Sequence, residues 1–180
     1  MVLNAGTGSI AMGRNANGRT SRAGGLGVHT GDEGSAADIG KKAALAAKLH
    51  YQQAGEETPL GKQLLRQLGH ESWKDFREDH LDVFPRLFPV VANAADAGDA
   101  TARKLLSDAA DQLALLVKQV VNDLSLRDQP FRLAKMGGMI GRCAFFDREL
   151  DSRIRVAAPN AVIGLLPVSP AHAAALLALQ

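Results

Sequence analysis

Short apolar runs separated by glycine-rich turns make up the first quarter of the chain. Glycine turns occur at Gly6 to Ser9 and at Gly24 to Gly27. Asn15 to Gly18 is typical of a further turn, because Asn and Gly both tolerate positive φ. Bounded by these turns, the apolar runs predict three short strands, at 2–5, 10–12 and 19–23.

From about Asp32 onward, apolar residues recur three or four positions apart, which indicates helices. Thr30 and Glu33 match a capping box that would begin the first helix, and Gly55 would end it. The pattern predicts further helices at 60–68, 72–81, 85–97, 100–124, 143–150 and 170–179. The first two of these lie on a helical insertion at about 58–82. Two later apolar runs, 131–136 and 161–166, predict strands.

The predicted order is three strands, helices, strand, helix, strand and helix. This order is typical of an α/β fold with one mixed sheet and helices on both faces. The chain has 180 residues, of which 46% are hydrophobic, which is enough for one ordinary domain with a real core. We therefore expect residues 1–180 to form a single domain.

Charge and cysteine content narrow the functional classes. The formal net charge is +2, and basic residues are interspersed with acidic ones, so nothing favours nucleic acid or an anionic membrane as a partner. No apolar stretch reaches the roughly 20 residues of a membrane span. The single cysteine, Cys143, permits no intramolecular disulfide. Together with the lack of a signal pattern, these features favour a cytoplasmic protein.

Three glycine motifs resemble a known family. Gly6-Thr7-Gly8-Ser9 resembles the second phosphate-binding turn of actin-like ATPases. Gly24 to Gly27 followed by Gly31 to Ala36 resembles the signature of N-acetylglucosamine kinases and the related BadF/BadG/BcrA/BcrD ATPases, and Met136-Gly137-Gly138 resembles their adenosine-contacting turn. The motifs span nearly the whole chain in the order of that family. The resemblance implies the C-terminal lobe of a ribonuclease H-like, actin-type ATPase.

The resemblance also implies roles for individual residues. ATP, with Mg²⁺, would be bound by Gly6, Thr7, Gly8, Gly137 and Gly138, and the amino sugar would be bound by Ser9, Ile10, Gly25, Leu26, Gly27 and Asp32. Glycines let backbone N–H groups approach phosphate oxygens, and a carboxylate such as Asp32 accepts hydrogen bonds from sugar hydroxyls. No metal ligand is assigned to the chain. The alternative is that the glycine turns are ordinary structural turns, and an acidic first-turn residue is a common helix stabiliser.

The implied activity is ATP-dependent phosphorylation of an amino sugar, N-acetylglucosamine or glucosamine. The family's other lobe, which carries the general base, is not recognised in the sequence, so the chain alone is expected to fold without kinase activity. Leu26 stands where many of these kinases have an aromatic residue. An activator ATPase of the BadF/BadG type, a non-catalytic sugar-sensing protein and an inactive fragment remain as alternatives. Whether the protein is a monomer or a homodimer is also left open.

Overall fold

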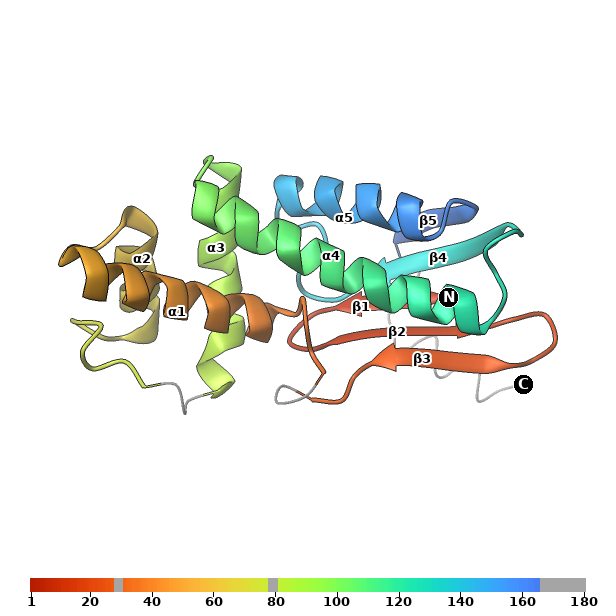
Figure 1. Cartoon of the computed structure of the whole chain (residues 1–180), viewed down its shortest axis with the longest axis horizontal. Helices are drawn as coiled ribbons and strands as arrows, with labels where there is room; N and C mark the ends of the chain where they lie inside the picture. Colours follow the sequence, from red (N-terminus) through yellow and green to blue (C-terminus); the bar gives the residue numbers. More distant parts are fainter. Residues whose placement is uncertain (28–30, 78–80, 166–180) are drawn as a thin grey trace.

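A mixed five-stranded sheet forms one part of the molecule, and a group of helices extends from one end of it (Figure 1). This computed structural model describes residues 1–27, 31–77 and 81–165. The strands are β1 (Val2–Ala5), β2 (Ser9–Arg14), β3 (Thr20–Gly24), β4 (Phe131–Met136) and β5 (Ala161–Leu165). The helices are α1 (Ala36–Ala54), α2 (Pro59–Leu68), the 3₁₀ helix η1 (Leu81–Leu87), α3 (Phe88–Asp96), α4 (Ala100–Asp123) and α5 (Ala144–Ala157).

The strand order is β3-β2-β1-β4-β5. The first three strands form an antiparallel meander, whereas β4 pairs parallel with β1 and β5 pairs parallel with β4. Consequently β1, β3 and β4 all run in the same direction and end at the same edge of the sheet. We call this the glycine edge, because each of these strands ends at a glycine turn or leads directly into one.

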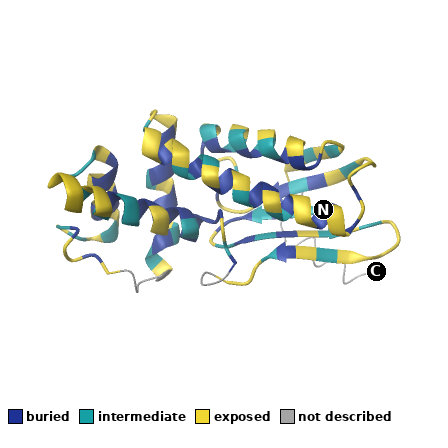
Figure 2. Ribbon diagram, viewed as in Figure 1, coloured by how far each residue is buried: buried dark blue, intermediate teal, exposed yellow. Residues whose placement is uncertain are grey.

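One face of the sheet is buried beneath helices. Leu3, Ala11 and Leu133 belong to this face, and each is at most 1% exposed. Helix α4 packs across β1, β2 and β3, and α5 packs against α4; Figure 2 shows the buried stripes of both helices turned toward the sheet. The buried residues form a continuous core that runs from the strands into the helical part.

Helix α1 begins later than the sequence predicts. Its N-cap is Ser35, whose hydroxyl accepts a hydrogen bond from the Asp38 N–H at 3.2 Å. In return, Asp38 Oδ2 accepts from the Gly34 N–H at 2.9 Å. Asp38 is therefore the acidic partner at the third helical position that Glu33 was expected to be. The expectation for Glu33 is wrong, and Thr30 lies outside the described residues.

The segment after α2 also departs from the sequence pattern. A helix is predicted over 72–81, but the described part of this segment is a turn in which the Ser72 hydroxyl accepts from the Lys74 N–H at 3.2 Å. Such a local side-chain bond competes with helix formation. Trp73 and Phe76 are buried with their rings edge to face, 5.6 Å apart. Burial of this aromatic pair outweighs the helical pattern.

The remaining elements follow the prediction closely. Strand β4 has the predicted bounds. Helix α5 continues past the predicted end at Leu150, because Ile154 and Ala157 extend its buried stripe. The helix predicted at 170–179 lies outside the described residues. The expectation of an α/β fold with a mixed sheet is confirmed.

Candidate functional site

Two glycine turns lie side by side at the glycine edge. Since β1 and β4 are parallel neighbours, the turns that follow them are brought together. A Cβ at Gly6 would lie 3.6 Å from the Gly138 nitrogen. Gly137 has a φ of +107°, and a Cβ there would lie 2.2 Å from the Ala5 carbonyl oxygen. The fold thus places the turn that the resemblance assigns to phosphate beside the turn that it assigns to adenosine.

Backbone hydrogen bonds orient the turn between β1 and β2. The Gly6 and Thr7 carbonyls accept hydrogen bonds from the first N–H groups of α1, those of Ala36 at 2.9 Å and Ala37 at 3.4 Å. In a trans peptide the N–H points opposite to the carbonyl of the same unit. The Thr7 and Gly8 N–H groups therefore point away from α1, and within the described residues neither has an acceptor. Adjacent N–H groups of this kind form an anion-binding concavity.

The Asp32 carboxylate lies directly against this turn. Its Oδ1 accepts a hydrogen bond from the Ser9 N–H at 3.2 Å. A Cβ at Gly8 would lie 2.9 Å from both carboxylate oxygens, so a side chain there would collide with Asp32. Asp32 is half-buried and Thr7 is exposed. A hydrogen-bond acceptor and an anion-binding turn are therefore adjacent.

The other predicted sugar contacts surround Asp32. The Ser9 hydroxyl is buried and donates to the Glu33 carbonyl at 2.8 Å, so it anchors the loop that carries Asp32. The Ser9 carbonyl accepts from the Gly25 N–H at 2.8 Å. Ile10 is half-buried, and its Cδ1 lies 2.7 Å from where a Cβ at Gly25 would be.

The loop after β3 closes on itself beside these residues. The Gly31 N–H donates to the Gly27 carbonyl at 3.0 Å, and a Cβ at Gly31 would lie 2.6 Å from the Leu26 Cβ. The Leu26 side chain is 63% exposed. The structure therefore gathers every predicted ATP and sugar residue along the glycine edge, and the predicted contacts themselves remain predictions. His29 lies outside the described residues.

Asn4 is a candidate residue that the sequence analysis does not single out. Its Oδ1 lies 2.7 Å from the position of a Cβ at Gly137 and 3.8 Å from that of a Cβ at Gly6, so its amide group sits between the two turns. The available signal was a polar residue in the otherwise apolar strand β1, two positions before the glycine turn.

Cys143 and Asp96 attach α5 to α3. Cys143 is buried and caps α5, and its Sγ lies 3.4 Å from Asp96 Oδ1. Asp96 accepts hydrogen bonds from the Phe145 N–H at 2.9 Å and the Ala144 N–H at 3.2 Å. The Phe145 bond is the main cause of the lowered pKa of Asp96, whereas burial raises the pKa of Cys143. A thiol in this environment acts as a structural cap.

The part of the chain that the structure describes contains neither a metal-binding cluster nor a membrane-spanning helix. No cluster of three or more His, Cys, Asp or Glu side chains there is arranged to hold a metal ion. None of the described helices combines the length and hydropathy needed to cross a membrane.

Comparison with solved structures identifies the class to which the fold belongs. A protein from Chromobacterium violaceum, assigned as an N-acetylglucosamine kinase, matches with a TM-score of 0.73 at 25% identity, over 99% of this chain and 59% of that one. A Porphyromonas gingivalis protein with the same assignment matches with a TM-score of 0.62 over 91% of this chain and 55% of that one. At 18% identity, the second shows the shared fold alone. The fold is that of an actin-like ATPase lobe.

Sequence comparison identifies the family. The pattern of the BadF/BadG/BcrA/BcrD ATPase family matches residues 1–178, and the chain belongs to this family. It is 34% identical to the N-acetylmuramic acid/N-acetylglucosamine kinase of Clostridium acetobutylicum and to the N-acetyl-D-glucosamine kinase of Dictyostelium discoideum. These matches cover 99% and 100% of this chain but 60% and 59% of the relatives. The chain therefore spans about three fifths of their length.

Proposed function

We propose that the full-length protein transfers the γ-phosphate of ATP to a hydroxyl of an amino sugar, N-acetylglucosamine or glucosamine, and that this chain contributes the nucleotide- and sugar-contacting half of the cleft. The observation that carries the proposal is the contact between the Asp32 carboxylate and Gly8. It sets an acceptor for sugar hydroxyls beside N–H donors for a terminal phosphate, as a phosphoryl transfer requires. The names of the relatives support the same substrate class.

The nucleotide would bind along the two joined turns. The N–H groups of Thr7 and Gly8 would hold phosphate oxygens, with the Thr7 hydroxyl as an additional donor. Gly137 and Gly138 would let the adenosine lie against the backbone, since a Cβ at Gly138 would meet nothing within 4 Å. Mg²⁺ would neutralise phosphate charge, and it is usually held by substrate phosphates with one or two carboxylates. A protein cage for the ion is therefore not required.

The sugar would bind between Asp32 and the loop at Gly25 to Gly27. An ionised carboxylate can accept hydrogen bonds from two hydroxyl groups at once. The exposed Leu26 side chain offers an apolar surface to the sugar ring but lacks the π-face of an aromatic residue. Sugar binding would therefore not depend on stacking of an aromatic ring on the sugar. Glucosamine and N-acetylglucosamine both remain candidate substrates.

The general base would come from the part of the protein that this chain does not contain. Among the predicted site residues, Asp32 is the single carboxylate, and it is assigned to hold the sugar. The rival activator-type ATPase would need cysteine ligands for an iron–sulfur cluster close to the glycine turns. The chain has one cysteine, and it is buried at the start of α5, so nothing in the described residues favours that alternative.

A coupled ADP-release assay tests the proposal. Full-length protein would be given ATP and Mg²⁺ with N-acetylglucosamine, glucosamine, N-acetylmuramic acid, glucose or no sugar. The proposal predicts ADP release that depends on an amino sugar and is matched by an equal amount of sugar phosphate. ATP hydrolysis that is indifferent to every sugar would contradict it.

A further inference from the structure

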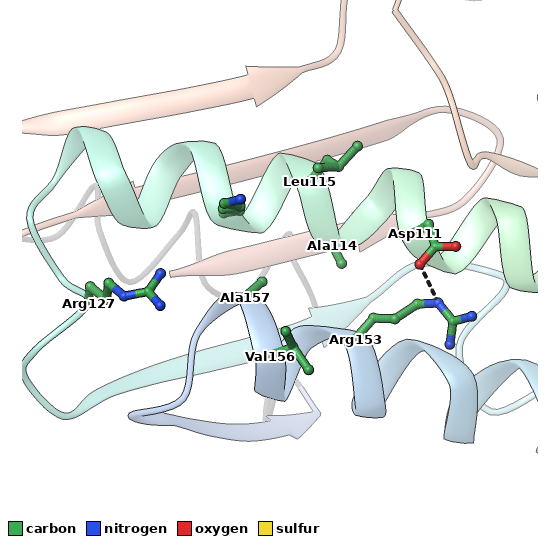
Figure 3. Close-up of a pocket in the computed structure, with 8 residues that line it drawn as sticks. Asp111, Ala114, Leu115, Arg127, Arg153, Val156 and Ala157 are labelled. Atoms are coloured by element: carbon green, nitrogen blue, oxygen red, sulfur yellow. Dashed lines mark hydrogen bonds and ion pairs between the residues drawn. The ribbon is translucent and has the colours of Figure 1, made fainter.

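A groove between α4 and α5 lies outside the candidate site. Its volume is about 420 Å³, within the range of small-molecule pockets, and it shares no residue with the glycine edge. Ala114 of α4 and Ala157 of α5 lie between the two helices, and Leu115 and Val156 flank them (Figure 3). The small alanines open the space, and the floor of the groove is apolar.

Charged residues complete the lining of the groove, and most of them are basic. Arg153 is engaged, with its Nε 2.5 Å from Asp111 Oδ1 and its Nη1 2.9 Å from Glu149 Oε2. Lys118 and Arg127 also line the groove, and no carboxylate among the described residues forms an ion pair with either of them. The groove therefore carries uncompensated positive charge.

Figure 3 shows Arg127 extending toward the gap between the helices from the segment that follows α4. Its backbone is anchored there, because the Arg127 carbonyl accepts a hydrogen bond from Asn160 Nδ2 at 2.8 Å. This bond fixes the backbone at Arg127, while the side chain itself is exposed. A guanidinium can bind a carboxylate or phosphate through two parallel hydrogen bonds. Lys118 adds a second positive charge to the same groove.

Apolar side chains remain exposed at the rim of the groove. Leu115 is 53% exposed and Val156 is 78% exposed. A single exposed apolar residue is ordinary on a protein surface. Here two of them adjoin an apolar floor and unpaired cations, which is the composition expected of a pocket with a few convergent polar groups.

We propose that the α4–α5 groove binds a small amphipathic anion: a carboxylate or phosphate monoester head on a compact apolar body. Arg127 and Lys118 hold the head, while Ala114, Ala157 and Val156 contact the body. The volume of about 420 Å³ admits a ligand the size of one aromatic ring with its substituent. This site is independent of the proposed kinase activity.

The binding test uses the full-length protein with three probes: phenyl phosphate, 4-phenylbutyrate and neutral benzyl alcohol. Calorimetry and thermal unfolding are measured for the unmodified protein, for Arg127→Gln and for Lys118→Gln. Arg155→Gln is the matched control, because Arg155 is exposed on α5 but does not line the groove. Thermal unfolding without a probe verifies that each variant is folded.

The proposal predicts saturable binding of both anionic probes and a raised melting temperature, with no such effect from benzyl alcohol. In Arg127→Gln, loss of a charged hydrogen bond should raise the Kd for both anionic probes about tenfold or more. In the control Arg155→Gln, the Kd should equal that of the unmodified protein. The proposal is overturned if neither anion binds, if Arg127→Gln and Lys118→Gln bind as the unmodified protein does, or if ATP displaces the probes. It is also overturned if sedimentation shows a dimer that Val156→Glu dissociates, because a second copy would then cover the groove.

Discussion

The Ala5 carbonyl oxygen lies 2.2 Å from where a side chain at Gly137 would begin. The same carbonyl accepts a hydrogen bond from the Met139 N–H at 3.1 Å. The end of β1 and the turn after β4 are thus held together by a contact that admits glycine alone. This relationship, more than either glycine motif by itself, makes one continuous surface of the two turns.

Gly137→Ala should disrupt this surface. The backbone must move to relieve the contact with Ala5, and an alanine at φ +107° is strained. The free energy of unfolding should fall by about 1–3 kcal/mol, and the KM for ATP should rise more than the KM for sugar. Gly138→Ala is the control for stability, because a Cβ there meets nothing within 4 Å. Urea unfolding checks the first effect and steady-state kinetics the second; equal stability of the two variants would refute the packing argument.

Asp32→Ala should impair sugar use more than nucleotide binding in the full-length enzyme. Loss of the acceptor leaves sugar hydroxyls unpaired, which costs on the order of 1–3 kcal/mol per buried group. We therefore expect a rise of about tenfold or more in the KM for sugar, with the KM for ATP little changed. Glu33→Gln is the matched control, since Glu33 is an exposed neighbouring acid. If Asp32→Ala lowers only the melting temperature, Asp32 is a structural residue.

Lys135 and Asp151 should respond unequally to substitution. The Lys135 ammonium pairs with Asp151 on α5, and the lysine side chain is 7% exposed while the aspartate is 37% exposed. Asp151→Asn leaves a buried cation without its partner and should lower the free energy of unfolding by roughly 1–3 kcal/mol. Lys135→Met keeps the apolar stem and should cost less. Urea titrations of both variants measure this difference, and a larger loss in Lys135→Met would argue against it.

Asp96 should make α5 sensitive to acid. Because the folded-state pKa of Asp96 is lowered, mainly by the Phe145 N–H, its contribution is present above the unfolded pKa of about 4 and is lost as the pH falls through the folded value. Asp96→Asn should therefore show a smaller difference in unfolding free energy between about pH 7 and pH 3 than the unmodified protein. Asp75→Asn is the control, because its exposed carboxylate forms no hydrogen bond or ion pair within the described residues. An unchanged pH dependence in Asp96→Asn would exclude this role.

The strands of the sheet were predicted well, because the residues that indicate each strand lie within or next to it in the sequence. Glycine turns bound β1 and β3, and an alternating run defines β4, so the strand bounds differ by a few residues at most. The start of α1 was misplaced because both Thr30 to Glu33 and Ser35 to Asp38 fit a cap. Only the tertiary contact of the turn carbonyls with Ala36 and Ala37 selects the second of these.

The candidate site was predictable in its residues but not in its contacts. Motif resemblance named Gly6 to Ser9, Asp32 and Gly137, yet their proximity depends on the parallel pairing of β1 with β4, which no local pattern specifies. The role of the Ser9 hydroxyl as a loop anchor depends on Glu33, 24 positions away. Asn4 was missed for the same reason, since its position between the turns is a property of the sheet.

The central claim is that ATP binds at the joined glycine turns. Hydrogen–deuterium exchange of the full-length protein, with and without ATP and Mg²⁺, tests it most directly, because the Thr7 and Gly8 N–H groups have no acceptor among the described residues and should exchange rapidly when no nucleotide is bound. The account predicts that ATP slows exchange at residues 6–9 and 137–139 and leaves the α4–α5 groove unaffected. Slowed exchange elsewhere, with both turns unchanged, would contradict it.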